Sequence, residues 1–207
     1  TRIVPVNADF SIPLEELCKN DGTVVLTNPN APTGMAVSLD EIERVLKSNP
    51  DHVVIVDEAY VDFGADSAVP LIGKYPNLLV VQTCSKSRSL AGMRIGFAFG
   101  CPDLIAALNT VKNSVNSYTL DRMALAAAQA AVEDTAYMDD TRTRVSNTRE
   151  STTGKLKNLG FTVLPSKANF VFASHKKVPG QTLFQQCQLL AGAQQNLGLH
   201  VKLFAAD

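Results

Sequence analysis

The sequence LLVVQTCSKSRSLAGMRIG, residues 78–96, joins an apolar run to a polar, glycine-containing loop with a lysine at position 86. The chain contains three similar apolar runs, and none of the four alternates with polar residues. Such runs are typical of strands covered on both faces, as in a parallel sheet between layers of helices. The four runs are TVVLT (23–27), VVIV (53–56), LLVV (78–81) and IGFAF (95–99).

The segments between the runs carry signals that start helices. Ser38, with Glu41 three residues later, forms a capping-box pattern before LDEIERVLKS, and Pro102 stands at a first-turn position before DLIAALNTVKN. Further elements are expected as helices at 120–133 and 139–158 and as strands at 161–164 and 169–173. The predicted fold class is therefore α/β, with a mostly parallel sheet flanked by helices, followed by part of a smaller α+β domain.

Composition excludes several classes of function. The 207 residues carry 19 Lys and Arg against 20 Asp and Glu, so no basic surface is expected for nucleic acid. The apolar runs are far shorter than the roughly 18 residues of a membrane helix, and no signal-peptide pattern opens the chain. Four cysteines and three histidines lie scattered, without zinc-ligand or disulfide spacing. We expect a cytoplasmic protein that binds no nucleic acid, membrane or metal.

The first cluster with chemical potential is NPNAPTG, residues 28–34, which follows the run 23–27. Open α/β sheets present their ligands beyond the carboxyl ends of strands. Two prolines and a glycine predict a rigid turn there, in which Asn28 and Asn30 can donate hydrogen bonds to a ligand. An ordinary strand-to-helix turn explains the same residues equally well.

The second cluster, DEAY, begins with Asp57 directly after VVIV. A carboxylate that leaves an apolar strand is costly to bury, so Asp57 predicts a positively charged or protonated partner. Capping of the next segment is the alternative role. An apolar run followed by Asp-Glu also resembles the acidic strand of nucleotide hydrolases, but the sequence contains no GxxxxGK[ST] loop.

The third cluster is SKSRSLAGMRIG, residues 85–96. Lys86 follows a buried run, so its amine is expected in a partly desolvated place, where lysines act as nucleophiles. Ser85 and Ser87 add hydroxyl donors, and Arg94 lies in a glycine-containing turn whose backbone can approach a phosphate. A solvated surface lysine is the alternative.

Taken in order, NPNAPTG, DEAY and SKSRSLAGMRIGF resemble the signatures of pyridoxal-phosphate-dependent aminotransferases of fold type I, most closely the histidinol-phosphate aminotransferase family. The resemblance continues through NSVNSYTLDRMALAAAQAA and LPSKANFVFA, over roughly residues 1–180. It implies transamination between histidinol phosphate and 2-oxoglutarate in histidine biosynthesis, by a cytoplasmic homodimer. It also implies that residues 1–135 are the C-terminal half of a cofactor-binding large domain, and residues 136–207 part of a small domain.

The same resemblance assigns pyridoxal 5′-phosphate as the cofactor and gives each matched residue a role. Lys86 would hold the cofactor covalently and then act as the general base. Asp57 would pair with the protonated pyridine nitrogen, and Tyr60 would bond the phenolate oxygen. Ser85 and Arg94 would bind the cofactor phosphate.

The chain departs from the family pattern at several places. Ala31 stands where the family usually has an asparagine bonded to the phenolate oxygen, and Asn30 or Asn28 is expected to replace it. Family members begin well before this chain, and residues 187–207 lose the family pattern. No arginine follows Arg149 to bind a substrate carboxylate. Two alternatives stay open: a non-catalytic fragment or scaffold that keeps the signatures, and a related aromatic aminotransferase or decarboxylase of fold type I.

Overall fold

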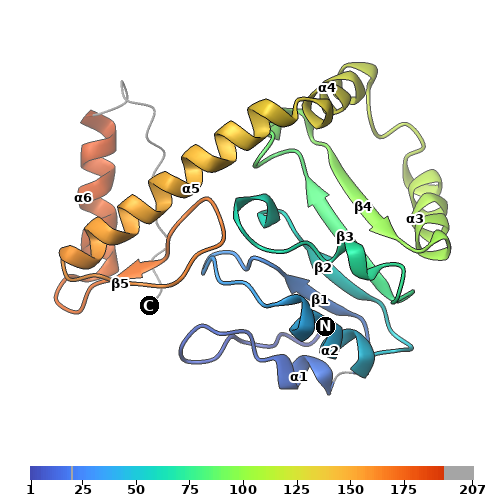
Figure 1. Ribbon diagram of the computed structural model, residues 1–207, viewed down its shortest axis with the longest axis horizontal. Coiled ribbons are helices and arrows are strands. Elements are labelled where there is room, and N and C mark those ends of the chain that lie inside the picture. The colour runs from blue at the N-terminus through green and yellow to red at the C-terminus, as the bar shows by residue number, and fades with distance from the viewer. Residues whose placement is uncertain (20, 194–207) are drawn as a thin grey trace.

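The computed structural model describes residues 1–19 and 21–193 (Figure 1), with side chains as far as residue 187. A four-stranded sheet with its helices forms the first part, and a long helix leads from it to a second part. The strands are β1 (Val24–Thr27), β2 (Val54–Asp57), β3 (Leu78–Thr83), β4 (Gly96–Gly100), β5 (Thr162–Val163) and β6 (Ala173–Ser174). The helices are α1 (Leu14–Cys18), α2 (Leu39–Ser48), α3 (Pro102–Val115), α4 (Arg122–Glu133), α5 (Thr135–Asn158) and α6 (Gly180–Ala193), with 3-10 turns η1 (Val61–Phe63), η2 (Val69–Leu71) and η3 (Ala91–Met93).

Strands β1, β2 and β3 lie parallel and side by side in chain order. Their registers pair Thr27 with Asp57 and Asp57 with Val81, so the carboxyl ends of these strands share one edge of the sheet. The three corresponding apolar runs are therefore confirmed as strands. The sheet confirms the predicted α/β class with a mostly parallel arrangement.

Strand β4 runs antiparallel to β3 and pairs Gly96 with Thr83. The expectation that this run belongs to a parallel arrangement covered on both faces is wrong. Residues 84–95 contain a 3-10 turn where a parallel crossover usually has a helix, so the chain returns beside β3 in the opposite direction. Gly96 permits the close approach, because a Cβ atom there would lie 2.7 Å from the carbonyl oxygen of Gln82.

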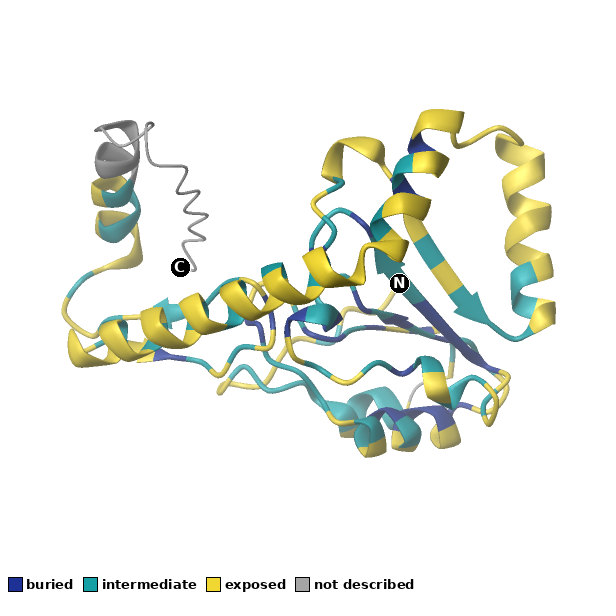
Figure 2. Ribbon diagram, turned by 45° about the horizontal axis from the view of Figure 1, so that its top comes forward, coloured by how far each residue is buried: buried dark blue, intermediate teal, exposed yellow. Residues whose placement is uncertain are grey.

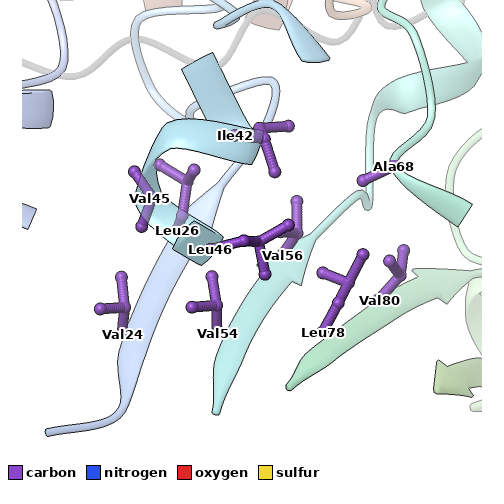
Figure 3. Packing of buried hydrophobic residues seen from close by; sticks show 10 residues of the cluster. All are labelled: Val24, Leu26, Ile42, Val45, Leu46, Val54, Val56, Ala68, Leu78 and Val80. Carbon is purple, nitrogen blue, oxygen red and sulfur yellow. The ribbon is translucent and has the colours of Figure 1, made fainter. Parts of the chain in front are cut away.

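Helix α2 covers one face of the sheet (Figure 3). It begins with the predicted capping box: the Ser38 hydroxyl accepts a hydrogen bond from the Glu41 N–H, and the Glu41 carboxylate accepts one from the Ser38 N–H at 2.7 Å. The helix buries Ile42, Val45 and Leu46 against alternate residues of the three parallel strands. The remaining members of this core are Val24, Leu26, Val54, Val56, Ala68, Leu78 and Val80.

Helix α4 extends the cover of the same face to β4. Phe99 packs against the α2 core, and Phe97, two residues earlier on the same face, packs against the buried alanines of α4. The opposite face is only partly covered within the described residues: Leu79 is buried there, whereas Val25 is 65% exposed and Ala98 is exposed. Helix α3 is also exposed along most of its length (Figure 2). The expectation of helices over both faces is thus met on one face of the described chain.

Two capped helices connect the sheet to the second part. Asp121 caps α4 by accepting a hydrogen bond from the Ala124 N–H, and Asp134 caps α5 by accepting one from the Tyr137 N–H. These aspartates explain why α4 starts two residues later, and α5 four residues earlier, than the predicted ranges 120–133 and 139–158. Both predicted helices are otherwise confirmed.

The second part contains less strand than the sequence predicts. The range 161–164 contains the short strand β5, limited to Thr162–Val163, but most of 169–173 is not strand, and β6 begins at Ala173. The hydroxyl of Ser166 donates to the carbonyl of Phe170 at 2.6 Å, which closes a turn where the strand was expected. Local side-chain to backbone bonds of this kind compete with strand pairing.

The C-terminal region is described as far as helix α6. The divergent segment 187–207 lies in α6 up to Ala193, and residues 194–207 fall outside the described residues. The four cysteines are free thiols. Across the described ranges, no helix combines the length and the apolar character that crossing a membrane requires.

Replacing Ser38 with alanine removes the hydroxyl that accepts from the first turn of α2. We expect Ser38→Ala to lower the free energy of unfolding by about 1 kcal/mol, the usual cost of losing such a cap. Urea denaturation followed by circular dichroism measures the change. Ser48→Ala, at the exposed C-terminal end of the same helix, is the control, and equal losses in the two variants would contradict the capping role.

Glu43 on α2 accepts hydrogen bonds from Lys74 at 2.8 Å and Lys47 at 3.0 Å, and these two ammonium groups lower the pKa of its carboxyl from 4.5 to about 2. A pKa that is lower in the folded state stabilises the fold above the unfolded-state value and loses this effect as the pH falls toward the folded-state value. We therefore expect Glu43→Gln to be less stable than the unmodified chain at pH 6.5, with a difference that shrinks between pH 4.5 and pH 2. Urea midpoints across this range test it, and a difference independent of pH would contradict it.

Candidate functional site

Three loops meet at the edge where β1, β2 and β3 end (Figure 1). They comprise residues 28–38, 58–68 and 84–95. Because Gly96 pairs with Thr83, β4 starts at this same edge, and Arg94 lies just before it. All the site residues predicted from the sequence therefore lie at one edge of the sheet, where α/β folds present their ligands.

The loop after β1 is held by its own asparagines. Asn28 is fully buried; its Oδ1 accepts from the Val37 N–H at 2.8 Å, and its Nδ2 donates to the Val37 carbonyl at 3.3 Å. Asn30 accepts from the Thr27 hydroxyl at 2.7 Å and donates to the Thr33 hydroxyl at 2.9 Å. The rigid turn is confirmed. The role of Asn30 toward a cofactor stays a prediction, and it rests on the second hydrogen of its amide.

Asp57 ends β2 and is partly buried. Val54 and Val56 face the α2 core, so strand alternation turns Asp57 toward the open face of the sheet. Its Oδ1 accepts a hydrogen bond from the Ala59 N–H at 3.0 Å. Among the residues that the structure describes, Asp57 has no ion-pair partner. Its carboxylate is therefore available to a protonated group.

Glu58, the next residue, is 1% exposed and acts as an anchor that sequence reasoning did not single out. Its Oε2 accepts from the Ser67 hydroxyl at 2.7 Å and from Gln82 Nε2 at 2.8 Å, and its Oε1 accepts from the Ala68 N–H at 2.6 Å. The carboxylate ties the loop after β2 to β3. The sequence signal that could have identified Glu58 is its position as a second carboxylate directly after Asp57.

Lys86 and Tyr60 contact each other across two of the loops. The Lys86 Nζ lies 5.2 Å from the centroid of the Tyr60 ring, which is within the range of a cation–π interaction. The Phe170 ring packs against Tyr60 at a centroid distance of 5.1 Å and an angle of 86°. Phe170 comes from the second part of the chain and was missed as a site residue, although it lies within the motif LPSKANFVFA.

The remaining predicted residues, Ser85 and Arg94, flank Lys86 on the same loop. The Ser85 N–H donates to the Thr83 hydroxyl at 3.1 Å. This bond uses the backbone of Ser85 and does not involve its hydroxyl group. Arg94 has a left-handed backbone, with φ at 55°, and is exposed. One guanidinium nitrogen donates to the Ala91 carbonyl at 2.9 Å, so the other N–H groups remain for an anion.

Two neighbours of Lys86 hold the loop in place. Ser87 is buried, and its hydroxyl donates to Asp62 Oδ2 at 2.5 Å. Arg88 donates to the carbonyl of Ala131 in α4 at 2.7 Å. Ser87, which the sequence suggested as a hydroxyl donor near a phosphate, is therefore engaged with the loop after β2.

A cavity of about 450 Å³ lies between residues 61–67 and helix α5. Gln82 and Arg142 line it, and none of the predicted site residues does. Gln82 donates to Glu58 and lies on the covered face with Val80, whereas Asp57 turns to the open face. The cavity therefore adjoins the loop after β2 on the covered side of the sheet, whereas Asp57 turns to the other side.

Comparison with known proteins identifies the family of this chain. The chain belongs to the family of class I and II aminotransferases, whose model matches residues 1–198. It is 55% identical over 186 residues to the histidinol-phosphate aminotransferase of Acinetobacter baumannii (strain AYE), a match that covers 90% of this chain and 52% of that protein. The histidinol-phosphate aminotransferase of Clostridium acetobutylicum is 51% identical over 184 residues, with 89% and 52% covered.

A solved structure supports the same relationship. The histidinol-phosphate aminotransferase of Sinorhizobium meliloti, in complex with pyridoxal-5′-phosphate, superposes with a TM-score of 0.81 at 25% identity and covers 97% of this chain and 55% of that one. These findings confirm the family resemblance seen in the sequence. The chain spans about half the length of the curated relatives it matches, as the 52% coverage of each shows.

Replacing Glu58 with alanine leaves three donors at the end of β2 and β3 without their acceptor. We expect Glu58→Ala to lower the free energy of unfolding by about 3 kcal/mol, because hydrogen bonds to a buried charged group are strong and costly to leave unmade. Urea denaturation measures the loss. Glu133→Ala, an exposed glutamate on α4, is expected to change stability by less than about 0.5 kcal/mol. A Glu58→Ala variant as stable as this control would contradict the anchoring role.

Proposed function

We propose that this chain is part of a pyridoxal-5′-phosphate-dependent aminotransferase that exchanges an amino group between histidinol phosphate and a 2-oxo acid. Relatives named for histidinol phosphate support the amino donor, and the solved relative that holds the cofactor supports the cofactor. The observation that carries the proposal is the contact between the Lys86 amine and the Tyr60 ring at the edge where Asp57 ends its strand.

The side chains at this edge have the chemistry that pyridoxal phosphate requires. An aldehyde needs a primary amine, a protonated pyridine nitrogen needs a carboxylate, and a phosphate needs hydroxyl and guanidinium donors. Lys86, Asp57 and the pair Ser85 and Arg94 provide these groups on neighbouring loops. The donor set therefore fits the cofactor.

When bound, pyridoxal phosphate supplies an electron sink for the charge that develops at the α-carbon of the amino donor. Asp57 holds the proton on the pyridine nitrogen, with its Oδ1 oriented by the Ala59 N–H. Lys86 would hold the cofactor through its aldehyde group, and its Nζ would move the proton of the α-carbon as the general base. The Tyr60 hydroxyl donates to the phenolate oxygen, and Ser85 and Arg94 bind the phosphate.

The proposal also covers the organisation of the protein. Residues 1–135 are the C-terminal half of a cofactor-binding large domain, and residues 136–207 are part of a small domain. The family resemblance supports a homodimer in the cytoplasm. Complete turnover needs polypeptide beyond this chain, a view supported by the exposed Val25 on the open face and by coverage of 52% of the A. baumannii relative.

A non-catalytic fragment or scaffold that keeps the family signatures is the second candidate, and the exposed Val25 on the sheet favours it. A decarboxylase is a further alternative, because a decarboxylase of a phosphorylated amino acid has the same fold. L-threonine-O-3-phosphate decarboxylase from Porphyromonas gingivalis superposes with a TM-score of 0.71 at 24% identity. A panel of histidinol phosphate, aromatic amino acids and threonine phosphate separates these reactions by their products.

A chimera tests the proposal, because the relative can provide the polypeptide that this chain does not match. Residues of the A. baumannii enzyme that match this chain are replaced by the residues of this chain, a span of 186 residues. We expect the chimera to bind pyridoxal phosphate, to carry a borohydride-fixed label on Lys86, and to transaminate histidinol phosphate. Peptide mass spectrometry locates the label, and 2-oxoglutarate consumption measures turnover.

Matched lysine variants complete this test. Lys86→Ala should abolish both the fixed label and transamination, because it removes the amine to which the cofactor aldehyde is proposed to attach. Lys112→Ala, on the exposed face of α3, should leave both unchanged. A label distributed over several lysines, or retained in Lys86→Ala, would remove Lys86 from its role and favour the non-catalytic reading.

A further inference from the structure

The Tyr60 ring lies between two groups from distant parts of the chain. Lys86 Nζ is 5.2 Å from the ring centroid, and Phe170 meets the ring edge-to-face at 5.1 Å. An edge-to-face contact fixes the plane of a ring, because it aligns the positive edge of one ring with the negative face of the other. An ammonium group is attracted to the face of an aromatic ring, so the plane of the Tyr60 ring sets where such a group binds.

Phe170 is held by a network that anchors the turn 166–170 to the first part of the chain. The Ser166 hydroxyl donates to the Phe170 carbonyl at 2.6 Å and accepts from the Ala168 N–H at 3.1 Å. The Lys167 N–H donates to the Gly34 carbonyl at 2.7 Å. These bonds fix the backbone of the turn against the loop that follows β1.

The guanidinium group of Arg149, whose side chain is 9% exposed, provides a second attachment. Nη1 of Arg149, on α5, donates to the Ala168 carbonyl at 2.8 Å and to the Phe63 carbonyl at 2.9 Å. One nitrogen therefore bridges the turn 166–170 and the loop that carries Tyr60. Gly34 leaves room for the turn 166–170, because a Cβ atom there would clash with the Ser166 hydroxyl.

We propose that Phe170 is a positioning residue, which fixes the Tyr60 ring so that the ring holds the Lys86 ammonium at the sheet edge. This inference deepens the proposed function, since Lys86 and Tyr60 are the residues assigned to the cofactor. Phe170, in the second part of the chain, thereby sets the position of the Lys86 amine in the first part. Phe170 itself touches the ring of Tyr60 and acts through it.

Phe172 provides a matched control from the same segment. Its ring packs against Phe10 at a centroid distance of 5.1 Å and an angle of 57°. Phe172→Leu therefore removes an aromatic contact of similar size on a different partner. Any effect that comes from general loosening of the segment appears in both variants.

The test measures acylation of lysines without any cofactor, so its outcome is independent of the proposed function. The purified 207-residue chain reacts briefly with the N-hydroxysuccinimide ester of acetic acid. Peptide mass spectrometry then gives the labelling of Lys86 relative to the exposed Lys176. Acylation requires the ester to reach Nζ, so an amine that packs against the Tyr60 ring reacts more slowly than one in open solvent.

We expect Phe170→Leu to raise the Lys86 to Lys176 ratio about two- to fivefold, the factor that corresponds to a cation–π contact at a partly exposed site. Phe170→Tyr keeps the edge-to-face ring and should restore the ratio of the unmodified chain. Phe172→Leu should leave the ratio unchanged. A ratio unaffected by Phe170→Leu, or raised equally by Phe172→Leu, overturns the proposal.

Two further variants test the proposal if circular dichroism shows that Phe170→Leu does not fold. Phe170→Met retains bulk without a ring and is expected to raise the ratio by the same factor. Tyr60→Leu removes the ring itself and should do likewise, and an unchanged ratio in that variant overturns the proposal. The proposed function fails separately, through absence of a cofactor label on Lys86 in the chimera.

Discussion

The parallel pairing of β1, β2 and β3 is the constraint on which the rest of the structure depends. Because Thr27, Asp57 and Val81 lie in register, the chain leaves each of these strands at the same edge. Segments far apart in sequence thereby become neighbours, and the polar residues that follow each strand face a common space. The α2 helix makes this pairing stable by burying the alternate valines and leucines of all three strands.

Buried polar side chains then hold the loops at that edge. Asn28 binds both backbone groups of Val37, and Glu58 accepts from donors on two segments. Ser87 is held by Asp62 in a similar way. Each of these groups would be costly to bury without its partners, so the bonds define one arrangement of the loops. Preorganised loops are what a site needs to hold reacting groups in fixed positions.

The second part of the chain contributes to the same edge through few but specific contacts. Arg149 and the turn 166–170 reach the loops after β1 and β2, while α5 itself buries none of its residues. The open face of the sheet, with Val25 exposed, lies on the side to which Asp57 turns. The chain spans about half the length of the aminotransferases it matches, and exposed apolar surface of this kind is typical of an interaction site.

The four strands of the larger sheet, the capped α2 helix and the family follow from the sequence, because apolar runs, the Ser38 and Glu41 pair and contiguous motifs are short-range signals. Tertiary structure alone decided the antiparallel direction of β4, the partners of Glu58, and the contact of Phe170 with Tyr60. The physical reason is separation along the chain. A residue's own neighbours set its local propensity, whereas a hydrogen bond from Gln82 to Glu58, or a ring contact across more than a hundred residues, exists only once the chain has folded back on itself.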